Sequence, residues 1–270
     1  MIEIPDIARQ EIEALLPEDL PTRPRALAVV EGVLAGMLWT DDAERPSWAV
    51  VIETADGTVF GGGDLTPRTI SRVMAEAMTA SGDLIFGFTG PNDPMRRLLP
   101  SDAYYRGSAI DFTDRVPPSA EADLAGAITP AGLTLVDLDA SILPRTEWAE
   151  DTLHAFGSPE AWTERGIGRC LVDGDGAVVA QGMAGPRVRG LMEMGVWTHP
   201  AYRNRGLGTI VSRRAAVAAE ATGATVWWNT NADNAGSIAI ARRLGFTRER
   251  RYDLVAYRTR GRATERDAVS

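Results

Sequence analysis

Helical and strand spacings of apolar residues alternate along the chain, which is typical of α/β proteins. In the first part, apolar residues at helical spacing predict helices over residues 4–16 and 67–80. Short apolar runs between turn residues predict strands over residues 33–39, 48–54, 58–61, 84–88 and 104–112. These elements predict a small α/β domain in the N-terminal part of the chain.

The second part predicts a mixed sheet with helices between its strands. Apolar runs predict strands over residues 133–138, 168–172, 177–184, 191–198 and 224–228, and a final pair over 246–250 and 252–258. Helical spacing predicts helices over residues 146–156, 206–221 and 235–244. The predicted fold class is therefore α/β, or α+β with a mixed sheet.

A polar segment that contains two adjacent prolines, residues 117–124, is the predicted linker between two domains. It divides the chain into an N-terminal α/β domain over residues 1–116 and a larger domain over residues 125–258. Residues 259–270 form a polar tail that we expect to be disordered.

The chain of 270 residues, 44% of them hydrophobic, is long enough to bury a sizeable core. No run approaches the roughly 18 apolar residues of a transmembrane helix, and no basic segment before an apolar stretch marks a signal peptide. We therefore expect a cytoplasmic protein that does not bind membranes. The single cysteine, Cys170, and the two histidines exclude an internal disulfide and a Cys/His zinc cluster, so we expect no metal.

All 28 basic residues are arginine, against 37 acidic residues, and the net charge is −9. The absence of lysine excludes Schiff-base enzymes, pyridoxal enzymes, a Walker A loop and a kinase-type lysine. From Arg187 onward there are 15 arginines against 7 acidic residues, so the excess of negative charge lies in the preceding part. A basic C-terminal part favours a polyanionic ligand, either nucleic acid or a phosphorylated cofactor.

The segment Arg203-Asn204-Arg205-Gly206-Leu207-Gly208-Thr209 joins a predicted strand to a long helix. Its two glycines let a ligand approach the backbone closely. The first amides of a helix have no partner within the helix and lie at the positive end of its dipole. Together with two arginines, these amides predict a pyrophosphate site. The alternative is an arginine-rich helix start with a glycine turn.

The order of strand, Arg-x-x-Gly-x-Gly, helix, strand and asparagine-led helix resembles the GNAT N-acetyltransferase superfamily. The first matching block is Arg203, Gly206 and Gly208, preceded by residues 196–202. The second block consists of Asn231-Ala232-Asp233-Asn234, Ser237, Ala241 and Leu244-Gly245-Phe246. With an α/β half in front of them, these blocks are also similar to the zwittermicin-resistance-type branch of the superfamily.

The resemblance implies that acetyl-CoA binds as a co-substrate where two parallel strands, residues 191–198 and 224–229, separate. Its pantetheine arm would pair with the backbone of the first strand. A bulge at Gly195 would free these backbone groups, or Gly195 would pack beneath a tryptophan, and an amide within residues 195–197 would hold the thioester carbonyl. The residues implied in acetyl-CoA binding are Val196, Trp197, Thr198, Arg203, Asn204, Arg205, Gly206, Leu207, Gly208, Thr209, Asn229, Asn234 and Ser237.

The acceptor amine must lose a proton before it attacks the thioester, so the reaction needs a base. Glu193 is the only acidic residue in its apolar strand, and burial beside Met192 and Met194 would raise its pKa. We therefore expect Glu193 to be the catalytic base. The alternative is an outward-facing glutamate that pairs with Arg187 or Arg189.

The superfamily commonly has a tyrosine that protonates the leaving thiolate, seven residues after the asparagine of the second block. Ala241 occupies this position, so the general acid stays unassigned, with Ser237, Tyr202, Tyr257 or water as candidates. The pair Trp227-Trp228 is expected in the core, or with one ring in the wall of the acceptor pocket.

The resemblance implies an N-acetyltransferase that moves the acetyl group of acetyl-CoA to a primary amine of a small molecule, by direct attack in a ternary complex. The acidic N-terminal half would supply part of the pocket for a cationic acceptor. The main alternative is a catalytically degenerate module that binds acyl-CoA or a partner. Nucleic-acid binding is disfavoured because core strands interrupt the arginines. A homodimer is left open.

Overall fold

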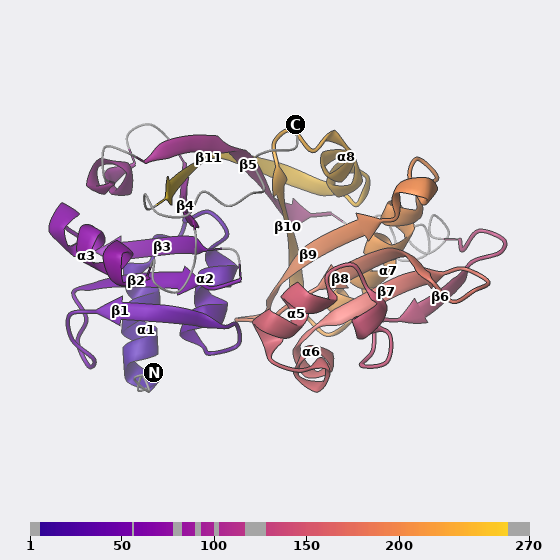
Figure 1. Cartoon of the computed structure of the whole chain (residues 1–270), viewed down its shortest axis with the longest axis horizontal. Coiled ribbons are helices and arrows are strands. Elements are labelled where there is room, and N and C mark those ends of the chain that lie inside the picture. The colour runs from indigo at the N-terminus through magenta and orange to yellow at the C-terminus, as the bar shows by residue number, and fades with distance from the viewer. Residues whose placement is uncertain are drawn as a thin grey trace. The chain divides into compact units, whose positions relative to one another are not determined.

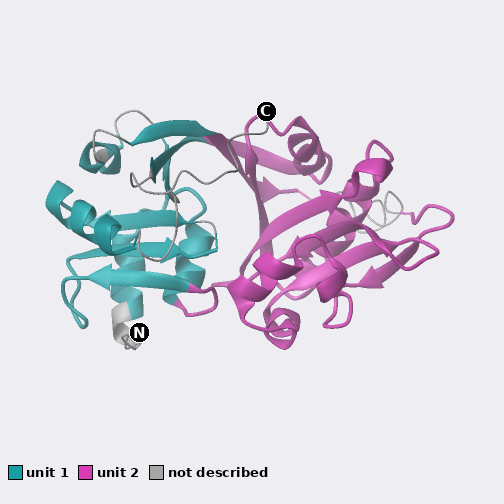
Figure 2. Ribbon diagram, in the orientation of Figure 1, with its two compact units in different colours: residues 1–30, 36–107, 252–270 teal, residues 31–35, 108–251 magenta. Residues whose placement is uncertain are grey.

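The computed structural model describes residues 6–55, 57–77, 83–89, 93–99, 103–116 and 128–258. These residues form two compact units that are interleaved along the chain (Figure 2). Unit 1 comprises residues 1–30, 36–107 and 252–270, and unit 2 comprises residues 31–35 and 108–251. The predicted linker at 117–124 and the tail at 259–270 lie outside the described residues. The domain boundaries therefore stay a prediction.

In unit 1 a small sheet packs against helices, with the strand order β1-β2-β3-β4-β11 (Figure 1). Strands β3 and β4 are parallel, whereas the pairs β1–β2, β2–β3 and β4–β11 are antiparallel. The core combines aliphatic residues of β2 with Phe86 and Phe88 of β4 and the buried side of α3. The helices are α1 (Asp6–Leu15), α2 (Arg23–Val30), α3 (Pro67–Ala77) and the 3-10 helix η1 (Pro94–Leu98). The first four strands are β1 (Gly36–Thr40), β2 (Trp48–Glu53), β3 (Thr58–Gly63) and β4 (Asp83–Phe88).

Unit 2 contains a mixed sheet with the strand order β11-β5-β10-β9-β8-β7-β6. Its strands are β5 (Tyr104–Arg115), β6 (Thr134–Asp137), β7 (Ile167–Val172), β8 (Val178–Ala184), β9 (Leu191–Thr198), β10 (Thr225–Asn231) and β11 (Phe246–Arg258). Its helices are α5 (Ala149–Phe156), α6 (Pro159–Arg165), α7 (Leu207–Ala221) and α8 (Ala235–Arg243), with 3-10 turns η2 (Leu143–Arg145) and η3 (Pro200–Tyr202). Strands β5 and β11 each begin in one unit and end in the other.

Helices cover both faces of the unit 2 sheet (Figure 1). A Cβ at Gly182 of β8 would lie 2.6 Å from the Val211 backbone, so α7 packs closely on one face, which we call the α7 face. A Cβ at Gly195 of β9 would lie 3.0 Å from the Trp148 ring, just before α5, on the opposite α5 face. Side chains alternate along a strand, so these two contacts assign each residue of β8 and β9 to the α7 face or the α5 face. The pairing of β10 with β9 extends the assignment to β10.

The structure confirms the predicted α/β fold and most of its elements, and it differs at three places. The predicted final pair is wrong, because residues 246–258 form one continuous strand, β11. Helices α2 and α6 have no counterpart among the predicted elements. None of the helices in the described ranges has both the length and the apolarity that crossing a membrane requires.

Candidate active site

The parallel strands β9 and β10 pair only along the first half of β9. Their register runs from Leu191 opposite Thr225 to Met194 opposite Trp228, and it stops there. Strand β9 continues to Thr198 and β10 continues to Asn231. Beyond this point the two parallel strands no longer pair with each other, as the resemblance implies.

The pairing with β8 decides which backbone groups of β9 face this opening. The Glu193 carbonyl accepts a hydrogen bond from Gly185, and the His199 amide donates one to Val179, both at 2.9 Å. Between these two residues the antiparallel ladder is regular, so the odd-numbered residues of β9 bond to β8. The even-numbered residues, Val196 and Thr198, therefore direct their N–H and C=O groups towards the opening.

Two expectations about β9 are corrected by this ladder. The bulge expected at Gly195 is wrong, because the register from Ala180–Thr198 to Ala184–Met194 does not shift. The alternative holds instead, since Gly195 packs against the ring of Trp148. The backbone of Trp197 is engaged by β8, so within residues 195–197 only Val196 presents its amide to the opening.

The predicted pyrophosphate loop follows directly after β9 and the short helix η3. Its backbone turns through two left-handed residues, Asn204 at φ 62° and Gly206 at φ 76°. Gly206 is the N-cap of α7 and, having no side chain, leaves the first turn without a side-chain cap. The first backbone bond of the helix runs from the Ile210 amide to the Gly206 carbonyl at 3.2 Å, so the amides of residues 207–209 lie before it.

The two glycines of the loop have different physical roles. A Cβ at Gly206 would meet nothing within 4 Å, so close packing does not explain this glycine. Its left-handed backbone favours glycine, and the missing side chain leaves the space beside the loop open. A Cβ at Gly208 would lie 3.0 Å from Ile240 of α8 and 3.1 Å from the Thr198 hydroxyl. Gly208 therefore lets α7 approach β9 and α8 closely.

The loop arginines are exposed and held at its rim. The Nε of Arg203 donates to the Thr198 carbonyl at 3.2 Å. The guanidinium of Arg205 lies over the Tyr202 ring, 5.2 Å from its centroid, and the Tyr202 hydroxyl donates to Asp173 at 3.3 Å. Both cations therefore lie in the segment that leads into the uncapped end of α7, where an anionic group is favoured.

The second block forms the start of α8. The Asn234 side chain accepts from the Ser237 amide at 3.0 Å, so Asn234 is the N-cap of α8. The Ser237 hydroxyl accepts from the indole N–H of Trp228 at 2.9 Å. Ala241 is fully buried in the core beneath this helix. The position at which the superfamily commonly has a tyrosine is therefore closed by packing.

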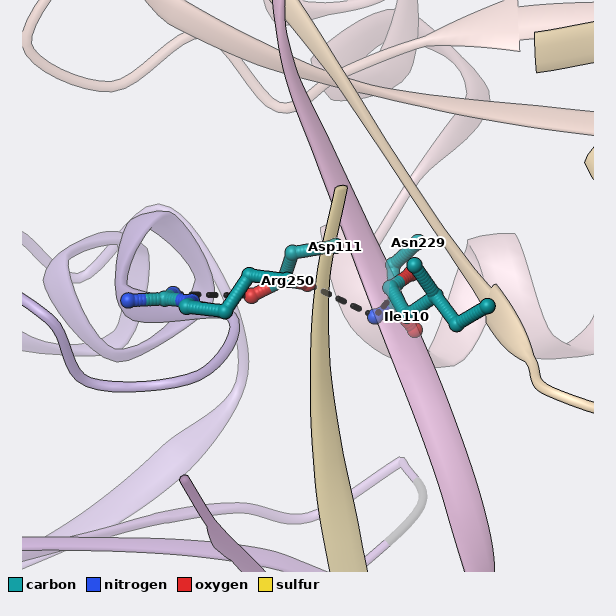
Figure 3. A network of polar contacts seen from close by, with 4 residues as sticks. All are labelled: Ile110, Asp111, Asn229 and Arg250. Carbon is teal, nitrogen blue, oxygen red and sulfur yellow. Dashed lines mark hydrogen bonds and ion pairs between the residues drawn. The ribbon is translucent and has the colours of Figure 1, made fainter. Parts of the chain in front are cut away.

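A buried polar network that the sequence did not predict lies on the α5 face, beside β10 (Figure 3). The Nδ2 of Asn229 donates to Asp111 of β5 at 2.8 Å, and Arg250 of β11 donates to the other oxygen of Asp111 at 3.0 Å. The Asp111 side chain is 3% exposed, and such a carboxylate needs its partners because an unpaired buried charge is costly. Asp111 thus fixes the orientation of the Asn229 amide.

Glu193 lies on the α5 face and is opposite Trp227 in the parallel ladder. Its expected burial between Met192 and Met194 is wrong, because both methionines point to the α7 face, where they belong to the core cluster. Glu193 itself is partly exposed. Arg189, one of the two arginines expected as alternative partners of Glu193, forms an ion pair with Glu31 at 2.7 Å.

Sequence comparison identifies the family of this chain. A family model for GNAT acetyltransferases matches residues 21–255. The chain belongs to the GNAT acetyltransferase family. Members of this family transfer acyl groups and generally use acetyl-CoA. A comparison with curated protein sequences finds no match.

Solved structures share the GNAT fold at low sequence identity. A GCN5-related N-acetyltransferase-like protein from Streptococcus suis 89/1591 is 16% identical, with 93% of this chain and 100% of that chain covered and a TM-score of 0.68. A tandem GNAT protein from the clavulanic acid biosynthesis pathway is 14% identical, with 94% and 93% covered and a TM-score of 0.58. A GCN5-related N-acetyltransferase from Kribbella flavida is 17% identical, with 88% and 96% covered and a TM-score of 0.56.

The predicted pyrophosphate loop has the hydrogen-bond donors and the positive charge that the phosphates of acetyl-CoA need. Three amides precede the first helical bond of α7, Gly206 leaves open space beside them, and two arginines flank them. A cavity of about 430 Å³ lies elsewhere, beside α8, and is lined by Ile110, Ala232, Ala235, Ile238, Ala239, Arg242, Glu249 and Arg251. Within the described residues, no three or more His, Cys, Asp or Glu side chains gather as metal ligands.

Proposed function

We propose that this GNAT protein transfers the acetyl group of acetyl-CoA to a primary amine of a small molecule by direct attack in a ternary complex. The observation that carries the proposal is the parting of β9 and β10 directly before an uncapped helix start flanked by arginines. The two features together offer a backbone edge for an extended arm and a cluster of donors for phosphates.

The phosphates would be held by Arg203, Arg205 and the amides at the start of α7. The arm would run along the edge of β9 beyond its last pair with β10, where Val196 presents its N–H and C=O groups; the Thr198 carbonyl on the same edge already accepts from Arg203. Asn229, whose Nδ2 is engaged by Asp111, lies on the facing strand. Acetyl-CoA supplies an activated acyl group as a thioester, with a thiolate as leaving group.

The amide of Val196 is the best-placed donor for the thioester oxygen in this proposal. It belongs to the free edge of β9, two residues beyond the last pair with β10. A preorganised amide at this place stabilises the negative charge that develops on the oxygen during attack.

Glu193 would accept the proton of the acceptor ammonium, directly or through one water. It lies on the α5 face, three residues before Val196 in the same strand. A glutamate has to be within hydrogen-bond reach of the amine to act in this way, and its contribution is then typically about 10²–10⁴ in rate.

A route through an acetylated cysteine is disfavoured by the state of the only thiol. Cys170 lies in β7 and is fully buried, and burial raises its pKa to about 12, an effect that the nearby Arg145 opposes and Asp139 adds to. The thiolate required for nucleophilic attack is therefore scarce at neutral pH. Direct transfer to the amine needs no such intermediate.

The test combines calorimetry with acetyl-CoA and a thiol-release assay against a panel of primary amines. Binding of acetyl-CoA followed by amine-dependent release of CoA supports the proposal. Binding without turnover of any amine would favour the degenerate acyl-CoA-binding module, which is motivated by the buried alanine at position 241. Absence of binding would contradict both.

A further inference from the structure

The indole N–H of Trp227, the residue opposite Glu193 in the ladder between β9 and β10, is buried and has no hydrogen-bond partner among the described residues. Trp227 of β10 is 4% exposed, and its Nε1 donates to no described atom. Three other tryptophans do donate, Trp39 to Glu76, Trp162 to the Leu138 carbonyl and Trp228 to the Ser237 hydroxyl. Among the described tryptophans, Trp227 is the one whose indole nitrogen is both buried and without a partner.

An indole N–H can only donate, so no rearrangement of its own hydrogen removes the unpaired state. Buried donors without a partner are rare in native proteins, because each has lost its bond to water without replacing it. Where one occurs at a binding site, a ligand atom that accepts the bond explains it.

Trp227 lies at the point where the strands part. It is opposite Glu193, one residue before the last pair of the ladder between β9 and β10. Trp228, its neighbour, points to the α7 face and belongs to the core. Because side chains alternate, Trp227 lies on the α5 face together with Glu193 and Asn229. The residue that carries the unpaired donor is therefore the cross-strand neighbour of the proposed base.

The charges on this face limit what can accept this hydrogen bond. Asp111 is neutralised by Arg250 at 3.0 Å, and the Nδ2 of Asn229 is engaged by Asp111. In the proposed reaction, the Glu193 carboxylate, opposite Trp227 in the ladder, receives the ammonium of the acceptor. An anionic oxygen bound to the indole would be repelled by this carboxylate, whereas a neutral oxygen would not. A cationic amine would be attracted by Glu193.

We propose that the indole N–H of Trp227 selects the acceptor, which is a primary amine that carries a neutral oxygen acceptor near its nitrogen. Amino alcohols, amino sugars and amino-acid amides belong to this class, whereas plain alkylamines do not. The inference rests on the proposed acetyl transfer, with the ammonium at Glu193 and the oxygen at Trp227. Trp227 is a specificity-determining residue in this scheme and takes no part in proton transfer.

The test replaces Trp227 by 3-benzothienylalanine, which keeps the ring shape and removes the N–H, and by phenylalanine (Trp227→Phe). The same two replacements at Trp228 are the matched control, because that N–H is paired and lies on the other face. Thiol release is measured with pairs of amines in which a hydroxyl replaces a methyl group, beginning with ethanolamine and n-propylamine. The wild type is expected to favour the oxygen-bearing member in kcat/KM by about tenfold or more.

The benzothienyl replacement at Trp227 is expected to reduce this preference to near unity, while that at Trp228 retains it. The Trp227 replacement should also leave the melting temperature of the free protein unchanged, whereas that at Trp228 lowers it through loss of the Ser237 bond. A preference that survives at Trp227, or an equal fall in melting temperature at both positions, would overturn the inference.

A second readout separates this inference from the proposed function. In ¹⁵N-indole spectra, the Nε1–H resonance of Trp227, assigned by its loss in Trp227→Phe, is followed while each amine is added to the protein with acetyl-CoA. A shift confined to oxygen-bearing amines supports the inference even if no amine is turned over, in which case acetyl transfer alone has failed. No shift with any amine, in a protein that acetylates amines, overturns the inference alone.

Discussion

Both units contain a strand, a helix and a second strand parallel to the first, but only unit 2 keeps the end of this motif open. In unit 1 the motif is β3-α3-β4, with Thr58 opposite Ile85 and Val59 opposite Phe86. In unit 2 it is β9-α7-β10. The same backbone arrangement therefore allows a direct comparison of two helix starts.

The helix start in unit 1 is closed by the protein itself. Thr66 caps α3, since its hydroxyl accepts from the Thr69 amide at 3.1 Å. Beside it, β3 is packed tightly, because a Cβ at Gly61 would lie 2.7 Å from Met95, and one at Gly62 would collide with the Leu15 carbonyl. The connection over residues 64–66 carries an aspartate and no arginine.

The helix start in unit 2 differs in each respect. Gly206 offers no cap, a Cβ there would meet nothing within 4 Å, and the longer connection over residues 199–206 carries two arginines. A strand–helix–strand motif alone therefore does not predict a phosphate site. The prediction also requires that the first amides of the helix are not capped by a side chain and that the adjacent charge is positive.

The largest effect on activity is expected from Glu193→Gln, which removes the proposed base. Glu193 also distinguishes the two motifs, since β3 in unit 1 has no acidic residue. The substitution preserves shape and removes basicity, so kcat should fall by roughly 10²–10⁴ at neutral pH. The loss should shrink at high pH, where the amine arrives neutral. Steady-state kinetics across pH and calorimetry with acetyl-CoA test this, with an unchanged dissociation constant expected. Near-normal kcat at every pH would remove Glu193 from the mechanism.

Gly206→Val is expected to make the open helix start resemble the closed one. A β-branched residue disfavours φ 76°, at a cost of about 1–2 kcal/mol, and the loop would have to change conformation. Loss of two amide–phosphate bonds, each about 1.5–3 kcal/mol, would weaken acetyl-CoA binding by roughly 100-fold or more. The measurement is calorimetry, with circular dichroism to verify the fold.

Gly206→Asn is the matched control for this substitution, because asparagine tolerates the left-handed region, as Asn204 does at φ 62°. It should retain most of the affinity. Equal losses for valine and asparagine would mean that the left-handed backbone is not what the site requires.

Arg205→Gln is expected to have a smaller effect, about tenfold in the dissociation constant for acetyl-CoA, through loss of one charge-assisted contact. Arg248→Gln is the control, since Arg248 lies on β11 with its side chain 74% exposed. The affinity difference between wild type and Arg205→Gln should diminish with added salt, because salt screens exposed charges. An Arg205→Gln variant that binds as the wild type does would limit the anion site to Arg203 and the amides.

The sequence predicts the elements whose apolar pattern is regular and misses those whose pattern is not. Helix α2 was not predicted because Ala26 to Val30 are all buried, so the segment lacks a polar stripe. Helix α6 is short, but its Ser158 cap followed by Pro159 was a usable signal. The polar run at residues 248–251 indicated a break that β11 does not have.

In the candidate site, the predicted pyrophosphate loop could be found from the sequence because its residues are neighbours along the chain. Arg203 to Thr209 are contiguous, and Asn234 caps its own helix. The Asp111 network could not be predicted, because Asp111 meets residues 118 and 139 positions away. The face of Trp227 depends on strand register, which no local pattern fixes. Strand β5 lies between β11 and β10 in the sheet, so a fragment that starts at residue 125 would lack a strand of unit 2.

The smallest effects are expected from removing one helix cap in each unit, and they sharpen the comparison most directly. Thr66→Ala removes the cap of α3, and Asn234→Ala removes the cap of α8. Each should lower the free energy of unfolding by about 1 kcal/mol, since each leaves one amide without its side-chain partner.

The two cap variants are expected to differ in ligand binding. Helix α3 begins in a closed environment, so Thr66→Ala should leave the dissociation constant for acetyl-CoA unchanged. Helix α8 follows directly after β10, and Ile240 of this helix packs closely against Gly208 of the predicted pyrophosphate loop. Asn234→Ala should therefore weaken binding several-fold. Denaturant titration and calorimetry on the same samples measure both quantities. If the two caps have equal effects on affinity, the helix start in unit 1 is not functionally closed, and the contrast between the units does not hold.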